Sequence, residues 1–311
     1  MQLQPIIDSP TRPTGDGRWK RRAIAALLGV TLLAGCSTLR LGYSQGSTLA
    51  YWWLDRYVDF DASQTPAVRQ ALERWFDWHR QTQLGEDVRL LEQAAREIEL
   101  DGGSTQACHW LRTAQKRRDL YAQQALPAVA ELVSQLSPQQ LQHLRHRFAE
   151  QDEDWREQNL QPDPAERRAA ALEKVVDRAQ MLYGRLDAGQ KRFLAERLRN
   201  SPWDPERWLL ERQRRAGDTV DTFRLLQGTE MTPLQQREVL NQWLLRATRP
   251  VDPQTQAHLD ELSTAQCSLA ADLHNRTSTE QRRHAQGVLR GWAQDLRGFL
   301  PMKAAATATS R

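Results

Sequence analysis

The chain has 311 residues, of which 40% are hydrophobic and 26% charged, and its formal net charge is +4. Without residues 1–35, which carry five Lys/Arg and two Asp/Glu, 38 basic and 37 acidic side chains remain. This balance argues against a nucleic-acid partner, which requires a strong excess of Lys and Arg. Basic clusters at 112–118 and 212–215 are interspersed with Glu and Asp at helical spacing, and we interpret them as solvated helix faces.

The first 35 residues have the organisation of a secretory signal. A basic segment at 18–22 precedes an apolar run at 23–33, which suits a signal sequence and is too short to cross a bilayer, since that takes about 20 residues. The following Leu33-Ala34-Gly35-Cys36 resembles the lipobox of bacterial lipoproteins, in which cleavage precedes a cysteine that then carries lipid. We therefore predict a signal peptide at 1–35 and lipidation of Cys36. The alternative is a secreted protein with a chance cysteine.

The lipoprotein resemblance also implies a location. Acyl chains on Cys36 would hold the protein to a membrane effectively permanently, and Ser37 favours the periplasmic face of the outer membrane. We expect residues 36–46 to form a lipidated flexible tether with a reach of about 35 Å. Residues 47–301 are predicted to form a single all-helical domain, followed by a disordered tail at 302–311.

From residue 47 onward the sequence is typical of helices. No segment shows the alternation of a strand, whereas apolar residues recur three and four apart among good helix formers. Ser, Thr or Asp followed by Pro recurs, as expected at a helix N-cap and its first helical position. We predict an all-α fold, a multi-helix array or bundle of about ten helices with short Pro-capped connections, in which Pro127 kinks or divides the fourth. The predicted helices are Ser47–Val58, Pro66–Gln83, Glu86–Leu100, Thr105–Gln135, Pro138–Asn159, Pro164–Tyr183, Ala188–Arg199, Pro205–Leu226, Pro233–Ala247, Pro253–Asn275 and Thr279–Leu300.

A five-residue pattern repeats along the chain: an apolar residue, a cap residue, two variable positions and Gln. It predicts a capping box, in which the cap side chain and the Gln side chain each bond the other residue's backbone amide. The pattern resembles the Leu-Thr-x-x-Gln motif of the Spy/CpxP family, helical periplasmic proteins that include ATP-independent chaperones. The alternative is that any Gln-rich helical protein shows such boxes. The copies begin at Phe60, Leu136, Leu186, Met231 and Leu262, and a weaker copy without the apolar residue begins at Ser278.

The most distinctive stretch is rich in tryptophan. It contains Tyr51-Trp52-Trp53-Leu54-Asp55, then Val58-Asp59-x-Asp61, and then Trp75-x-x-Trp78-His79-Arg80. Together with the lipobox, these motifs resemble a group of proteobacterial lipoproteins of about this length that is classed as a domain of unknown function. The resemblance implies a helical envelope lipoprotein with no assigned activity.

The polar residues of this stretch allow two interpretations. In one, the aspartates, His79 and Arg80 line a site walled by tryptophans that holds a sugar or peptide. In the other, the tryptophans belong to the core, Asp61 caps a helix, and Asp59, Asp77 and Arg80 form ion pairs. The candidate partner surface comprises Trp52, Trp53, Asp59, Trp75, Trp78, His79 and Arg80.

Two cysteines remain besides Cys36. Because disulfides persist in the compartment that a secretory signal implies, we favour one disulfide between Cys108 and Cys267 over two buried free thiols.

The sequence contains no positive sign of catalysis. Signatures such as Gly-x-Ser-x-Gly and His-Glu-x-x-His are missing, and His143 and His146 are interpreted as helix-surface residues rather than metal ligands. We therefore predict no catalytic, cofactor-binding or metal site. We expect a non-enzymatic protein that binds protein or peptide partners, with a chaperone-like role included. The alternatives are an envelope-assembly scaffold with one dedicated partner, or a protein that binds or cleaves cell-wall glycan.

Overall fold

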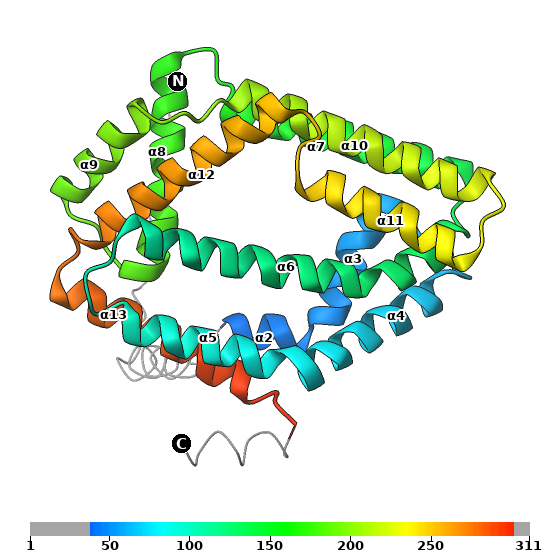
Figure 1. Ribbon diagram of the computed structural model, residues 1–311, viewed down its shortest axis with the longest axis horizontal. Helices are drawn as coiled ribbons and strands as arrows, with labels where there is room; N and C mark the ends of the chain where they lie inside the picture. Colours follow the sequence, from blue (N-terminus) through cyan, green and yellow to red (C-terminus); the bar gives the residue numbers. More distant parts are fainter. Residues whose placement is uncertain (1–37, 302–311) are drawn as a thin grey trace, which may run out of the picture.

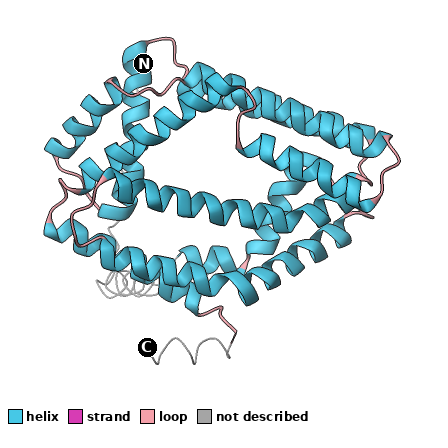
Figure 2. Ribbon diagram, viewed as in Figure 1, coloured by secondary structure: helices cyan, strands magenta, loops and turns pink. Residues whose placement is uncertain are grey.

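The computed structural model describes residues 38–301, and every regular element in that part is a helix (Figure 2). The all-α prediction is therefore confirmed. The predicted signal peptide, Cys36 and the tail at 302–311 lie outside the described residues. The helices are α2 Thr38–Ser44, α3 Gly46–Val58, α4 Thr65–Trp78, the π-helical turn η1 His79–Gln83, α5 Leu84–Glu97, α6 Ser104–Val133, α7 Pro138–Asn159, α8 Pro164–Tyr183, α9 Ala188–Arg199, α10 Pro205–Gly228, α11 Pro233–Thr248, α12 Pro253–His274 and α13 Thr279–Arg297.

The predicted caps place the helix starts correctly. Although α4 begins at Thr65, one residue before the predicted Pro66, the five helices α7, α8, α10, α11 and α12 begin at the predicted proline. In each case the cap side chain accepts a backbone N–H of the first turn, as Ser137 does from Gln140 at 3.1 Å. These starts are local features, because a cap satisfies amides that the helix itself leaves unpaired.

The predicted flexible tether is wrong for the described residues. Residues 38–44 form α2, and α3 begins only two residues later. The backbone N–H of Gln45 donates to the Leu41 carbonyl and that of Leu49 to the Gln45 carbonyl, so helical bonding crosses the junction. Side chains of α2 also pack on the C-terminal part of the chain, where the Tyr43 ring lies 4.9 Å from the Phe299 ring. This packing stabilises a helix that the composition alone does not predict.

Two predicted interruptions do not break the helices. The segment 65–97 runs through α4, η1 and α5, because the Leu84 N–H donates to the His79 carbonyl five residues earlier and keeps the backbone bonded. Pro127 lies inside α6, which continues to Val133. The proline removes one helical hydrogen bond, but the buried Leu126 and Val133 on either side hold α6 in the core.

The helices trace a closed, flattened outline in Figure 1, with α7 and α10 along the upper edge and α5 with α13 along the lower edge. The long α6 crosses the middle and contacts both α11 and α12. Because α13 packs along α5 and also contacts α2, the two ends of the described chain lie together. Three buried apolar clusters hold the array: one among α3, α4, α6, α7, α10 and α11, one among α8, α9, α12 and α13, and one between α5 and α13.

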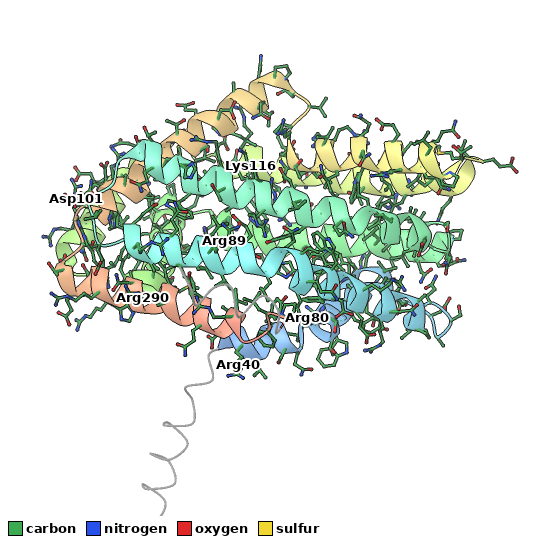
Figure 3. All side chains as sticks on the ribbon, turned by 60° about the horizontal axis from the view of Figure 1, so that its bottom comes forward. Arg40, Arg80, Arg89, Asp101, Lys116 and Arg290 are labelled. Carbon is green, nitrogen blue, oxygen red and sulfur yellow. A yellow bond between two sulfur atoms is a disulfide. The ribbon has the colours of Figure 1, made fainter. Side chains whose placement is uncertain are left out.

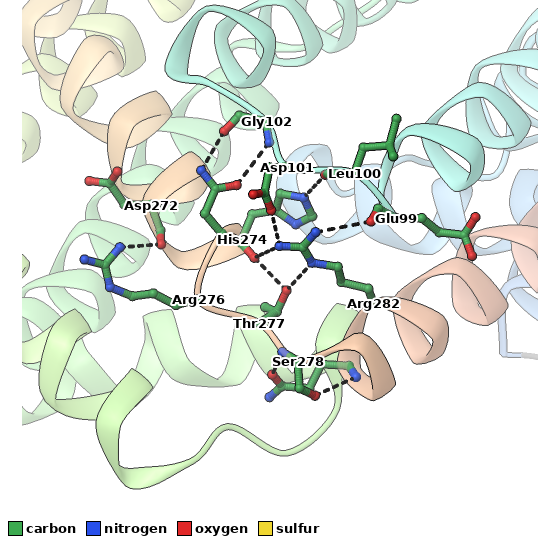
Figure 4. Close-up of polar contacts among 12 residues, drawn as sticks. Glu99, Leu100, Asp101, Gly102, Asp272, His274, Arg276, Thr277, Ser278 and Arg282 are labelled. Atoms are coloured by element: carbon green, nitrogen blue, oxygen red, sulfur yellow. Dashed lines mark hydrogen bonds and ion pairs between the residues drawn. The ribbon is translucent and has the colours of Figure 1, made fainter.

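The loop between α5 and α6 is tied to the turn between α12 and α13 (Figure 4). His274 Nε2 donates to the Leu100 carbonyl at 2.7 Å, and Asn275 exchanges two 3.0 Å hydrogen bonds with the Gly102 backbone. The Arg282 guanidinium bonds the Asp101 carboxylate and the Glu99 carbonyl. These contacts join segments about 175 positions apart in sequence and fix one end of the array.

Four of the predicted capping boxes interlock in two pairs. Gln64 and Gln140 form reciprocal side-chain hydrogen bonds of 3.2 and 2.6 Å, and each also donates to a carbonyl just before the other's cap. Gln190 and Gln281 form the same arrangement at 2.7 and 2.9 Å. Each Gln therefore caps its own helix and locks it to a second one. The predicted copy at Leu262 is wrong, because its residues lie inside α12.

The structure joins Cys108 on α6 to Cys267 on α12 by a disulfide. The bond links positions 159 residues apart, and the enclosed segment includes α7 to α11. It therefore fastens the central helix to one of the last two helices.

Candidate functional site

An apolar groove of about 730 Å³ lies between α3, α4 and α6. Its α4 wall includes Ala67 and Ala71, one turn apart, and its α6 wall includes Ala122, Ala125 and Ala128. These small side chains leave space between the two walls unfilled, because an alanine occupies little of it. Further lining residues are Ala50, Leu54, Val68, Leu72, Trp75, Phe76, Tyr121, Val129 and Leu132, with the polar Gln64, Arg74, Gln124, Glu131 and Gln135 among them.

A half-buried polar cluster lies at one end of this groove. Asp87 on α5 accepts hydrogen bonds from Tyr121 at 2.6 Å and from Arg117 at 2.9 Å, and lies 3.1 Å from His79 Nε2. The Tyr43 hydroxyl lies 2.8 Å from the other ring nitrogen of His79. The cluster thus connects α2, η1, α5 and α6, and Tyr121 belongs both to it and to the groove lining.

The partners of His79 define its hydrogen-bonding roles. An ionised Asp87 only accepts, so Nε2 of His79 carries the proton that points to it. In the neutral ring Nδ1 is then an acceptor, and the Tyr43 hydroxyl donates to it. Burial raises the pKa of Tyr43 to about 12, so this hydroxyl keeps its proton at neutral pH. The hydrogen bonds from Tyr43 through His79 to Asp87 hold α2, η1 and α5 together.

Burial alone would raise the pKa of Asp87, but hydrogen bonds from His79 and Tyr121 and the charge of Arg117 outweigh it and hold this pKa below its usual 3.8. Likewise, burial would raise the pKa of Glu211, but hydrogen bonds from Arg214 and Arg215 lower it below 4.5. Both carboxylates therefore stabilise the fold only while they are ionised.

These shifts predict an acid-sensitive fold. Since both groups bind protons less readily in the folded chain than in the unfolded chain, their stabilising contribution is complete above about pH 5 and is lost as the pH falls through the lowered folded pKa values. We expect the free energy of unfolding, measured by urea titration, to fall between pH 5 and pH 3. An Asp87→Asn variant should show a shallower fall. A wild-type stability that is flat across this range would contradict the prediction.

The predicted partner surface is divided between two places. Trp52 and Trp53 lie exposed on α3, whereas Trp75, Trp78 and His79 pack around Tyr121, with the Trp75 ring stacked on His79 at 5.4 Å. A single site walled by all four tryptophans is therefore not formed.

The aspartates of this stretch have structural roles. Asp61 exchanges hydrogen bonds with Gln64 in the turn that leads into α4, and Asp77 pairs with Arg80 on the surface. Asp59 ends α3 in the left-handed conformation at φ 58°, and its carbonyl accepts from Gln140. The predicted ion pair between Asp77 and Arg80 is present, Asp61 bonds the turn before α4 rather than the N-cap position itself, and no ion pair is found for Asp59 among the described contacts.

The basic clusters are not simply solvated. Arg117 is 17% exposed and pairs with Asp87, and Arg212 pairs with Asp152 at 3.0 Å. Arg214 and Arg215 both bind Glu211, which is 6% exposed. The prediction of solvated faces is therefore wrong for these four arginines. Arg117 and Arg212 pair with acids from other helices, which spacing along one helix does not show, whereas Glu211 lies on α10 itself, at the helical spacing, but is buried.

The histidines predicted to lie on a helix surface make ordinary contacts: His146 pairs with Glu150, and His143 contacts the Arg56 carbonyl. Within residues 38–301, no three His, Cys, Asp or Glu side chains are grouped so that they could hold a metal ion. In the same range, no helix combines the length and apolar composition needed to cross a membrane.

Sequence reasoning missed Asp87, Arg117 and Tyr121, and it missed the groove. The groove's alanines carry no chemical signature, and Asp87 is an ordinary first-turn acid of α5 until Arg117 meets it from α6.

Comparison with known proteins supports the predicted family. No curated protein and no solved structure matches the chain. Residues 56–226 match a family of unknown function, DUF6279. This segment includes α4 to α9, both walls of the groove formed by α4 and α6, and the Asp87 cluster except Tyr43. Since it spans more than half of the chain, the protein belongs to the DUF6279 family.

Proposed function

We propose that this protein is a lipid-anchored, non-enzymatic component of the cell envelope that binds an apolar helical segment of a partner protein in the groove between α3, α4 and α6. Cys36 supplies the anchor, and Ser37 favours the periplasmic face of the outer membrane. The observation that carries the binding function is the groove itself, whose lining is mostly apolar although it opens to the surface.

The dimensions of the groove favour a helix as the occupant. One wall runs from Gln64, just before α4, to Phe76, and the other from Tyr121 to Gln135, two residues past the end of α6, so the walls are about 18–21 Å long. A guest helix of three to four turns fits that length. The alanines on both walls allow its backbone to approach closely.

The rim of the groove carries opposite charges on its two walls. Arg74 on α4 and Glu131 on α6 are exposed on opposite walls. A guest helix with an acidic side chain toward Arg74 and a basic one toward Glu131 would match both charges. The expected partner therefore presents an amphipathic helix with a narrow apolar face.

Photocrosslinking in cells tests the groove. A photoreactive residue in place of Ala71 in the full chain is expected to give protein adducts, because Ala71 lines the groove. Ala125→Glu on the opposite wall should reduce those adducts at least tenfold, since burying an unpaired carboxylate against an apolar helix costs several kcal/mol. Adduct yield is measured by immunoblot and mass spectrometry.

The matched control is Ala169, an exposed alanine of α8 outside the groove. A photoreactive residue there should give few adducts, and Ala169→Glu should leave the Ala71 adducts unchanged. Adducts at Ala71 that survive Ala125→Glu would overturn the proposal, provided that circular dichroism shows an intact fold.

The same experiment separates two forms of the function. One dominant adduct favours a scaffold with a dedicated partner, and many different adducts favour a chaperone-like role. In the second case, purified residues 37–311 should slow the aggregation of a denatured client at near-equal ratio, and Ala125→Glu should weaken this effect. A wild-type protein without effect at tenfold excess would contradict the chaperone form.

A further inference from the structure

The outer face of α3 exposes an unusual set of side chains. Trp52 is 58% exposed, Trp53 60% and Leu49 47%. At 100° per residue these three lie with Arg56 within an arc of about 100° on one side of the helix. The Trp53 ring is supported by Tyr57 at 4.9 Å, which packs on Phe148 at 5.8 Å, so it is held outward rather than collapsed onto the body.

This face is distinct from the groove. Ala50 and Leu54 of α3 line the groove, and Tyr51 and Val58 are buried in the core, all on other sides of the helix. Substitutions at Trp52 or Trp53 therefore leave the groove lining unchanged.

The chain places α2, the helix that precedes this face, close to the lipidation site. Only Ser37 separates Cys36 from α2, so the start of α2 lies within about 7 Å of the lipidated residue. With α2 in place of a flexible tether, the body has little freedom to move away from the bilayer. Figure 3 shows the blue ribbon that begins at α2 along the lower edge of that view, where Arg40 is labelled. Leu41 on α2 is also 65% exposed.

We propose that the outer face of α3, formed by Leu49, Trp52, Trp53 and Arg56, rests in the interfacial layer of the membrane to which Cys36 is anchored. The proposal rests on the lipid anchor of the proposed function. Tryptophan favours the membrane interface, where its ring is in the apolar layer and its N–H remains hydrated. An arginine beside it suits the phosphate groups of the lipids. The groove, on a different side of α3, then remains free for a partner.

Quenching of tryptophan fluorescence tests this orientation. The lipidated mature protein is reconstituted into phosphatidylethanolamine and phosphatidylglycerol vesicles that contain lipids brominated on the acyl chains. We expect bromolipid to quench part of the emission, and Trp52→Phe with Trp53→Phe to remove most of that quenching. The matched control is Trp203→Phe with Trp208→Phe, a neighbouring pair of rings at the start of α10, which should leave the quenching unchanged.

Mass spectrometry of the peptide that contains Cys36 checks the anchor separately. If lipidation is confirmed and bromolipid does not quench, or quenches the Trp52/Trp53 variant as strongly as the wild type, the proposal is overturned. A photoreactive residue at Trp53 that forms adducts with a protein instead of lipid would also overturn it, and would make this face a protein interface.

Discussion

Replacing both Cys108 and Cys267 with serine is expected to lower the free energy of unfolding by about 4–5 kcal/mol, because the disulfide closes a loop of 159 residues and restricts the unfolded chain. The measurement is urea unfolding followed by circular dichroism at 222 nm. Since such a loss exceeds a third of the free energy of unfolding of many domains, the variant should also be more sensitive to proteolysis.

The single variants and chemical reduction provide the controls. Wild-type protein in dithiothreitol should match the double serine variant, because both lack only the cross-link. Each single variant should lose a similar amount of stability. A difference between them would show how well a serine fits each site, since Cys108 on α6 is half-buried and Cys267 on α12 is buried. A double variant within 1 kcal/mol of the wild type would contradict the prediction.

The two helices joined by this bond pack on each other but lie far apart in sequence. Between them lie α7 to α11, and α6 also contacts α11 while α12 contacts α9. The disulfide therefore restricts the large central section of the chain. This effect depends on an oxidising compartment, which agrees with the proposed envelope location.

Helix starts could be predicted because their determinants are local. Ser137-Pro138-x-Gln140 contains the cap, the proline and the reciprocal Gln within four residues, and α7 begins at that proline. The same pattern at Leu262 to Gln266 failed because nothing there ends the preceding helix, so Ser263 lies inside α12. A capping box marks a helix start only where the backbone is free to begin one.

Contacts between helices could not be predicted in the same way. Each capping box satisfies its own amides, and nothing in the pattern states that Gln64 will bond Gln140 or that Gln190 will bond Gln281. The groove is still less visible. Ala71 and Ala125 are good helix formers at any position, and their role appears only when α4 and α6 are brought together to line the groove.

Replacing Asp87 with asparagine is expected to lower the free energy of unfolding by about 2–4 kcal/mol, because it leaves the charge of Arg117 without its partner in a site where that side chain is 17% exposed. Asparagine has nearly the same shape, so the loss reports charge and hydrogen bonding rather than a cavity. It also presents an amide group toward His79 Nε2, which donates to the carboxylate in the wild type. Thermal and urea unfolding at pH 7 measure the effect.

Asp77→Asn provides the matched control. Asp77 is 58% exposed and its ion pair with Arg80 lies on the surface, so the loss of this pair should change stability by less than about 0.5 kcal/mol.

A double-mutant cycle of Asp87→Asn with Arg117→Gln then separates two explanations. If the cluster acts as a unit, the double variant is less destabilised than the sum of the single variants by about 1–3 kcal/mol, because the second change removes the unpaired charge that the first created. Additive losses would mean that Tyr121 and His79 hold Asp87 independently of Arg117. In the first case, the shape of the groove at this end depends on the ion pair. Asp87→Asn should then displace the Tyr121 ring and also reduce crosslinking from Ala71, whereas Asp77→Asn should leave that crosslinking unchanged.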